Sequence, residues 1–478
     1  MTASAQVLGG AQAELAWLCY RSGLAHFCNR NVAQALGSFE RAILFYEAQA
    51  NTHGLAMATM WHIRLRCLHG LVPYGVLPSG VEILQTIVSG LSDGDTDLRG
   101  QLMEALSQAY YHARQMEAAH DWANQALDLG HRDQDDRLCM RAGEALGKSY
   151  LGNLHVNLAI NRWESALEAA RESGDLFLQR QNLLNLPLAF NLNGDLESAE
   201  ATAVQGVEIC RRMQDWAGYS IALSQIASIL AAQGKFHLVE ECAQHTRLMV
   251  EQSGYPWGRI RALEALAYTY AVQGKSPQAE EALDLIVEPP EVFPPAGPVE
   301  HLLVRVMRQL IRAYQSQSLT ERIATLSQEL MEVVKHDPRS LAPLCAVIEL
   351  AQQTLMPSLT DWPAAMLADA VERGVCLTSG WCFVIDRTLG VAARMQKNWG
   401  EASTHFVRAI EVARKVGAEP ELGRAYLDLA ILLVERDGYR GDPLVLNLLN
   451  HAGVYLQALR MEPFAAVVRQ MKNEHSAV

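Results

Sequence analysis

A forty-residue spacing governs the middle of this 478-residue chain. A tyrosine, phenylalanine or leucine returns at this interval five times, and a branched aliphatic residue precedes each of them by four positions. Alanine dominates two further columns, and glycine fills a turn column in three consecutive repeats. Such a period is typical of a repeat array, in which each unit buries its apolar face against its neighbours. The first two columns are Tyr110, Tyr150, Phe190, Leu230 and Tyr270, and Leu106, Leu146, Leu186, Ile226 and Leu266.

Within each unit the apolar spacing is helical. Leu146 and Tyr150 are four residues apart, and Ala159, Trp163 and Ala166 follow at intervals of four and three. Both patterns place apolar side chains on one stripe of a helix. Glycines between the stripes mark turns, because glycine ends a helix at low steric cost. Each unit is therefore predicted to be an antiparallel pair of helices of roughly 15–17 residues.

The repeat also carries a family signature. Leu146-Gly147-x-x-Tyr150 followed by Ala159-x-x-x-Trp163-x-x-Ala166 resembles the tetratricopeptide pattern. The resemblance implies an all-α, right-handed superhelical solenoid of antiparallel helix pairs. The forty-residue unit is longer than the usual thirty-four, and in this it resembles the C-terminal arrays of bacterial ATP-dependent transcription activators and class III nucleotide cyclases. The same pattern occurs twice more, at Leu389-Gly390 with Ala402, Phe406 and Ala409, and at Gly23 with Ala35, Phe39 and Ala42.

The register divides the chain into five stretches. Residues 1–98 are predicted to hold N-terminal units with an irregular insert near 70–95, around a short apolar segment, Val81 to Leu91. Residues 99–288 hold the five regular units, and the Pro-rich stretch 289–298 is a connector that cannot be helical. Residues 299–380 are expected to form degenerate helix pairs, and 381–478 C-terminal units with capping helices.

One short stretch, Gly143 to Tyr150, reads GEALGKSY and suggests a phosphate-binding loop. A P-loop needs four residues between its glycines and a preceding strand, whereas this stretch has three and follows the acidic run Asp133 to Asp136. Gly147 also occupies the small-residue column of the repeat. The stretch is therefore predicted to be helical, with no role in nucleotide binding.

Composition excludes several classes of function. With 40 basic and 53 acidic residues, the net charge of −13 disfavours a surface for nucleic acid or for an anionic membrane. The nine scattered cysteines contain no C-x-x-C pair, which suits reduced thiols better than a disulfide framework or a zinc site. The N-terminus lacks the pattern of a signal peptide and no apolar run is long enough to span a membrane. We expect a cytoplasmic protein.

No catalytic constellation emerges from the sequence. There is no H-E-x-x-H, no G-x-S-x-G and no cluster of histidine with carboxylates at metal-ligand spacing. His245 and His301 are expected to be structural. We therefore predict a non-enzymatic protein without catalytic residues, cofactor or metal. An enzyme with its site in the degenerate region 299–380 would require converging ionisable groups in a closed pocket.

The functional surface is then expected on the first helices of the units, which line the concave face of a solenoid. Three columns should project there, including Arg141 and Arg261 as anchors for a backbone or carboxylate. Neighbouring Arg–Glu pairs on one helix could instead satisfy each other. The candidates for partner binding are Gln101, Glu104, Arg141, Glu144, Lys148, Gln181, Asn185, Ser224, Gln225, Arg261, Glu264 and Tyr268.

These observations favour an interaction scaffold that binds a protein or peptide in the groove. The resemblance to sensor arrays implies a bacterial signalling, regulatory or assembly system. The alternative is a ligand-sensing receptor, in which a small peptide or metabolite changes the closure of the superhelix.

Overall fold

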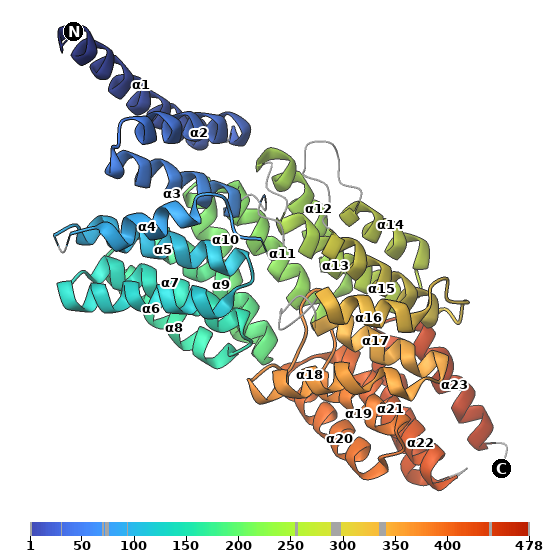
Figure 1. Ribbon diagram of the computed structural model, residues 1–478. Coiled ribbons are helices and arrows are strands. Elements are labelled where there is room, and N and C mark those ends of the chain that lie inside the picture. Colours follow the sequence, from blue (N-terminus) through green and yellow to red (C-terminus); the bar gives the residue numbers. More distant parts are fainter. Residues whose placement is uncertain are drawn as a thin grey trace. The chain divides into compact units, whose positions relative to one another are not determined.

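Helices account for nearly all of the structure. A computed structural model describes residues 2–29, 31–68, 71, 76–92, 94–253, 257–287, 298–333, 341–438 and 442–476. Over these residues it contains helices but no strand, only one isolated β-bridge, between Leu377 and Val384 (Figure 1). The predicted all-α fold of paired helices is confirmed. Within the described part, no helix is long and apolar enough to cross a membrane. The helices of the first half are α1 (Thr2–Cys28), α2 (Val32–Ala48), α3 (Thr52–Leu68), α4 (Val81–Gly90), α5 (Thr96–His112), α6 (Met116–Asp133), α7 (Asp136–Gly152), α8 (Val156–Glu172), α9 (Leu176–Asn193), α10 (Leu196–Arg212), α11 (Trp216–Ala232) and α12 (Phe236–Ser253).

The second half continues the series. The residues from 299 to 380 form helices, as do those from 381 onward, wherever the structure describes them, apart from the turns between them. The Pro-rich connector 289–298 falls almost entirely outside the described residues, since 288–297 are not among them. The helices are α13 (Trp257–Val272), α14 (Ser276–Val287), α15 (Pro298–Tyr314), α16 (Ile323–Val333), α17 (Leu341–Thr354), α18 (Asp361–Glu372), α19 (Ile385–Met395), α20 (Trp399–Val416), α21 (Glu419–Asp437), α22 (Pro443–Ala458) and α23 (Glu462–Ser476), with a 3-10 turn, η2 (Pro357–Leu359).

Turn chemistry sets the helix boundaries of the central pairs. α5, α7, α9 and α11 start at residues 96, 136, 176 and 216, so the repeat of the sequence is also the repeat of the helices. Asp195 and Asp215 cap α10 and α11 by accepting hydrogen bonds from the backbone N–H groups of Ser198 and Gly218. Gly194, Gly234 and Gly274 lie in the left-handed region, with φ of 85°, 78° and 80°. Glycine adopts this conformation at little cost, which explains the glycine column.

The chain divides into two compact units, which are described separately. Unit 1 comprises Met1–Gly152 with Ser165–Leu178, and unit 2 comprises Asn153–Glu164 with Gln179–Val478. The boundaries predicted from the sequence at 98, 288 and 380 stay predictions.

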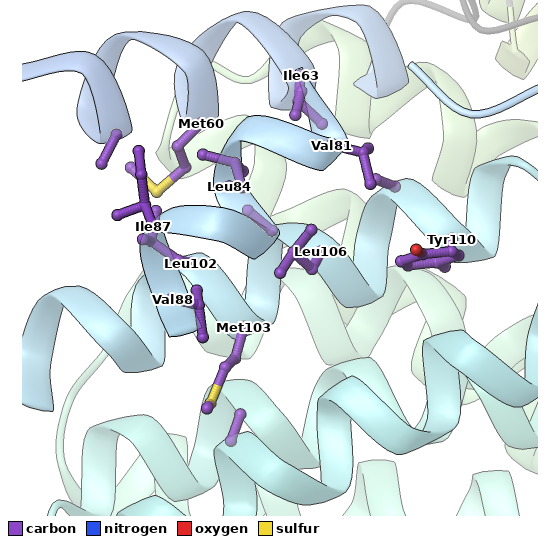
Figure 2. Close-up of a cluster of buried hydrophobic side chains, with 14 of the residues drawn as sticks. Met60, Ile63, Val81, Leu84, Ile87, Val88, Leu102, Met103, Leu106 and Tyr110 are labelled. Carbon is purple, nitrogen blue, oxygen red and sulfur yellow. The ribbon is translucent and has the colours of Figure 1, made fainter. Parts of the chain in front are cut away.

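The core of unit 1 lies where the sequence register is interrupted. Figure 2 shows Met60 and Ile63 of α3 facing Leu84 and Ile87 of α4, with Leu102 of α5 beneath them. All five side chains are buried. The short apolar segment of the irregular insert is thus the second helix of a pair, because its apolar stripe packs against α3 and α5.

Unit 2 is held together by contacts between helices far apart in the sequence. A Cβ added at Gly194 would lie 3.0 Å from Val416, and at Gly234 it would lie 2.7 Å from Leu459. At Gly274 it would lie 3.4 Å from Pro463. The glycine turns of α9–α14 therefore pack directly on the C-terminal helices, and helices on both sides of residues 289–298 share one compact body.

Candidate functional site

The stretch GEALGKSY lies wholly within α7 and is not a phosphate loop. Ser149 donates its hydroxyl to the backbone oxygen of Leu146 at 2.8 Å and is buried. Lys148 forms an ion pair with Glu144 at 2.6 Å, one helical turn away. A helix offers none of the converging backbone N–H groups with which a P-loop holds phosphate. The structural interpretation of this segment is confirmed.

The first helices α3, α5 and α7 lie side by side in unit 1. Their shared surface, here called the charged face, carries five ionisable side chains and two glutamines from these helices. The two glutamates are more deeply buried than the bases: the side chain of Glu144 is 3% exposed, whereas that of Lys148 is 20% exposed. The acids thus lie below a more accessible layer of bases. The charged face consists of Arg64, Gln101, Glu104, Gln108, Arg141, Glu144 and Lys148.

Glu104 is the centre of the contacts on this face. Its carboxylate accepts hydrogen bonds from Arg64 and Gln108, each at 3.2 Å, and Nε of Arg141 lies 3.5 Å away. Gln101 donates instead to Asp97 at 3.0 Å. Because three neighbours from three helices converge on one carboxylate, the face is a connected network rather than a set of isolated pairs.

Lys148 of the charged face is held in its charged form. Burial alone would lower the pKa of Lys148, but the adjacent Glu144 carboxylate outweighs it and raises that pKa above its ordinary value. Lys148 can donate three hydrogen bonds, and Glu144 takes one of them. The arrangement can therefore present cationic donors to a ligand while the buried acids offset their desolvation.

Sequence reasoning missed Arg64. α3 starts at Thr52 and α5 at Thr96, a step of 44 residues, whereas the next three first helices each start 40 residues after the last. The insert between α3 and α5 thus shifts the register by four, and Arg64 is the equivalent of Gln108 and Lys148. Aligning helix ends across the insert would have revealed it.

The candidates on α9 and α11 in unit 2 are engaged in structural contacts. Gln181 accepts a hydrogen bond from Arg180 at 2.8 Å, and Arg180 also pairs with Asp215 at 2.6 Å. Gln225 is buried and donates to the backbone oxygen of Leu184 at 2.7 Å. Ser224 donates within its own helix, to Ile221 at 2.7 Å, and Asn185 also makes interactions. The contacts of Gln225 and Arg180 link the neighbouring first helices α9 and α11.

The three candidates on α13 lie against a segment of the same chain. Arg261 donates to the hydroxyl of Ser379 at 2.9 Å, and a Cβ at Gly380 would lie 2.8 Å from Oε2 of Glu264. Tyr268 is fully buried, with its ring centroid 5.9 Å from that of Trp381 in an edge-on arrangement. Where an open groove was expected, this part of the face is therefore covered.

The covering segment is a tight turn between α18 and α19, here called the hairpin, residues 376–384. Leu377 and Val384 form its β-bridge, and the backbone N–H of Thr378 donates to Phe383 at 3.1 Å. The backbone N–H groups of Cys376 and Leu377 donate to the oxygen of Leu192 at the end of α9, at 2.7 and 3.1 Å. The hairpin thus joins α9 and α13, a contact that sequence reasoning did not predict.

Known proteins resemble this chain in fold rather than in sequence. No protein-family model and no curated protein matches the sequence. A solved structure of a Rap protein complexed with competence and sporulation factor has a TM-score of 0.51 and 14% identity, over 86% of this chain and 99% of that chain. The fold is tetratricopeptide-like.

Two further structures are less similar. The apo form of RapI has a TM-score of 0.37 at 12% identity, covering 75% of this chain and 98% of that chain. The Cut9–Hcn1 hetero-tetramer of APC/C has a TM-score of 0.33 at 11% identity, covering 93% and 96%. Likeness at this level indicates neither family nor function, and that to the Rap protein shows the fold alone.

A buried ionic cluster links α17 of the degenerate region to α19 and α21 of the C-terminal units in this tetratricopeptide-like chain. Arg387 of α19 pairs with Glu349 of α17, and with Glu421 and Asp428 of α21 at 2.8 Å each. Arg424 pairs with Glu349 and, at 3.0 Å, with Glu421. Burial alone would raise the pKa of Glu349, but Arg424 and Arg387 outweigh it and hold that pKa below its ordinary value. The ions satisfy one another and tie three helices together.

Aromatic rings complete the surroundings of this cluster. The guanidinium of Arg424 lies 4.6 Å from the ring centroid of Phe464 and 5.3 Å from that of Tyr314. Tyr314 also donates its hydroxyl to Glu349 at 2.8 Å. Among the described residues, no group of three or more His, Cys, Asp or Glu side chains is placed to hold a metal ion. Because the ions and rings of this cluster are engaged with one another, we assign it a role in packing.

Proposed function

We propose that this chain is a non-enzymatic interaction module that binds a protein or peptide on the charged face of unit 1. The observation that carries the proposal is the layering of that face. Glu104 and Glu144 are buried below Arg141, Lys148 and Arg64, whose side chains are 15–20% exposed. Burying ions is costly unless they are paired, and the positions equivalent to Glu104 and Glu144 on α9 and α11 hold the apolar or small residues Leu184 and Ser224.

The dimensions of the charged face suit a short segment of extended chain. Neighbouring packed helices lie about 8–10 Å apart, so the axes of α3 and α7, with α5 between them, are separated by about 16–20 Å. An extended peptide advances about 3.3 Å per residue, so about five or six residues span the face. Arg141 and Lys148 would bind carbonyl or carboxylate oxygens of that segment.

The similarity of this fold to that of a protein in complex with a binding partner also supports the proposal. The Rap protein that shares it is complexed with competence and sporulation factor. The forty-residue unit resembles arrays of bacterial signalling proteins, so we place the chain in a bacterial signalling, regulatory or assembly system. Its nine free cysteines suit the reducing cytoplasm.

Catalysis is not part of this proposal. The most conspicuous buried ionisable groups, around Arg387, are already engaged with one another, and a reactive acid or base has to reach a substrate. Tyr268 is also fully buried, so its hydroxyl is not placed to reach a substrate. Output from such a module would come from the partner that it binds.

A random peptide display library, selected on the immobilised full chain, tests the proposal. Selected peptides should bind at least about tenfold more weakly to an Arg141→Gln/Lys148→Gln variant, because two charged hydrogen bonds are lost. Arg132→Gln is the matched control, since this arginine lies on the second helix α6 and its side chain is 60% exposed. Circular dichroism would confirm that the variants fold. Failure to select any peptide, or equal affinity for the double variant and the unaltered chain, would refute binding at this face.

A further inference from the structure

The same pair of charges occurs on two first helices, three repeats apart. Arg141 and Glu144 of α7 recur 120 residues later as Arg261 and Glu264 of α13. The residue one turn further on differs, being Lys148 on α7 and Tyr268 on α13. In unit 2 this trio already holds a peptide segment, the hairpin, so its contacts show what such a trio recognises.

Recognition of the hairpin by α13 depends on two adjacent residues. The hydroxyl of Ser379 accepts a hydrogen bond from Arg261 at 2.9 Å. Gly380 follows with φ of 83°, and any Cβ there would lie 2.8 Å from the carboxylate of Glu264 and 3.1 Å from its Cβ. The Arg–Glu pair thus fits a hydroxyl residue followed by a glycine in the left-handed conformation, and a larger second residue would collide with the glutamate.

The third position of the trio contacts the residue after the glycine. On α13 the buried ring of Tyr268 packs against Trp381, the residue after Gly380. On α7 the equivalent residue is Lys148, an ammonium group with three donors, of which Glu144 takes one. A carboxylate would therefore match Lys148 where an aromatic ring matches Tyr268.

From this correspondence, and resting on the proposed function, we infer the chemical class of the ligand of unit 1. It is a peptide turn in which a serine or threonine precedes a glycine, and an acidic residue follows that glycine. Arg141 would donate to the hydroxyl, Lys148 would pair with the acid, and the glycine would pass over the position of the buried Glu144. The hairpin itself stays in place on α13, because Leu377, Phe383 and Val384 anchor it in the core.

A cyclised, fluorescein-labelled peptide that copies Leu377 to Val384 with the changes W381E and C382S is the probe. Its affinity for the full chain is measured by fluorescence anisotropy. We expect binding that weakens at least about tenfold in Arg141→Gln and in Lys148→Gln, and that is unchanged in Arg132→Gln. Copies of the peptide that also carry S379A or G380A should bind at least about tenfold more weakly, and the copy that keeps the tryptophan should bind more weakly than the acidic one.

The outcomes separate this inference from the proposed function. No binding of the acidic hairpin peptide, or equal binding of its G380A copy, overturns the inference. If display-selected peptides still depend on Arg141, the proposed function stands while the ligand class is wrong. If neither kind of peptide depends on Arg141, both are wrong.

Discussion

Removing the guanidinium of Arg387 should be among the most damaging substitutions in unit 2. This side chain is 2% exposed and contacts three carboxylates, of which Glu421 is fully buried and Glu349 is 8% exposed. An Arg387→Met substitution leaves Arg424 to compensate both of these buried acids. Breaking a buried ion pair from one side costs about 3–5 kcal/mol.

That free energy converts into a measurable shift. Unit 2 comprises roughly three hundred residues, for which the entropy of unfolding near 60 °C is about 0.6 kcal/mol per degree. The Tm of the Arg387→Met variant should therefore fall by about 5–8 °C. Differential scanning calorimetry gives the Tm, and urea titration followed by circular dichroism gives the free energy of unfolding.

Two further variants serve as comparisons. Arg394 lies on the same helix and is equally buried, but its partner Glu435 is about half exposed, so Arg394→Met should cost about 1–2 kcal/mol or less. Adding Glu421→Met to Arg387→Met removes one uncompensated acid and should recover part of the loss. An Arg387→Met protein as stable as the Arg394→Met protein would show that uncompensated buried carboxylates do not dominate here.

Three further outcomes are expected. Because the folded-state pKa of Glu349 lies below its unfolded value, ionised Glu349 stabilises the fold above about pH 4.5. This contribution to the free energy of unfolding should be lost as the pH falls through the folded-state pKa. Greater stability at pH 3 than at pH 5 would contradict this expectation. Gly380→Ala should lower the free energy of unfolding by more than the about 1–2 kcal/mol expected for Gly417→Ala, because both have positive φ but only Gly380 faces a clash. At pH 8, iodoacetamide should label exposed Cys28 but not Cys345, since burial raises the pKa of Cys345 to about 12; mass spectrometry would detect labelling of Cys345 only after unfolding.

Local pattern was sufficient to predict the helix pairs. The Leu146 and Tyr150 columns indicate which side of a helix is apolar, and glycines such as Gly194 indicate where a helix ends. Both signals depend only on neighbours within one unit and on contacts with the next unit. The same periodicity also identified Gly143 to Tyr150 as helix rather than phosphate loop, because Gly147 stands in a repeat column.

Contacts between distant repeats could not be predicted in this way. The hairpin meets α13 through Ser379 and Arg261, which are 118 residues apart in the chain. The ionic cluster joins Glu349 to Arg424, 75 residues apart. Charges at these positions look like ordinary solvated residues on a helix surface, since a single sequence carries no signal for which distant helix will cover them. The exposed or covered state of Arg141 and Arg261 could therefore not be distinguished from the sequence.

The difference between these two arginines follows from the residues around them. Tyr268 supplies α13 with an aromatic surface on which Trp381 packs, so a segment of the chain can be buried there and a carboxylate–glycine contact can be made inside the fold. Lys148, paired with Glu144, supplies α7 with a charge in place of the apolar ring on which such a segment could pack. One substitution in an otherwise repeated trio thus separates a position used for internal packing from one suited to a soluble, charged ligand. Lys148→Tyr should therefore abolish binding of the acidic hairpin peptide and favour the copy that keeps the tryptophan, and unchanged peptide preference in that variant would show that this column does not determine specificity.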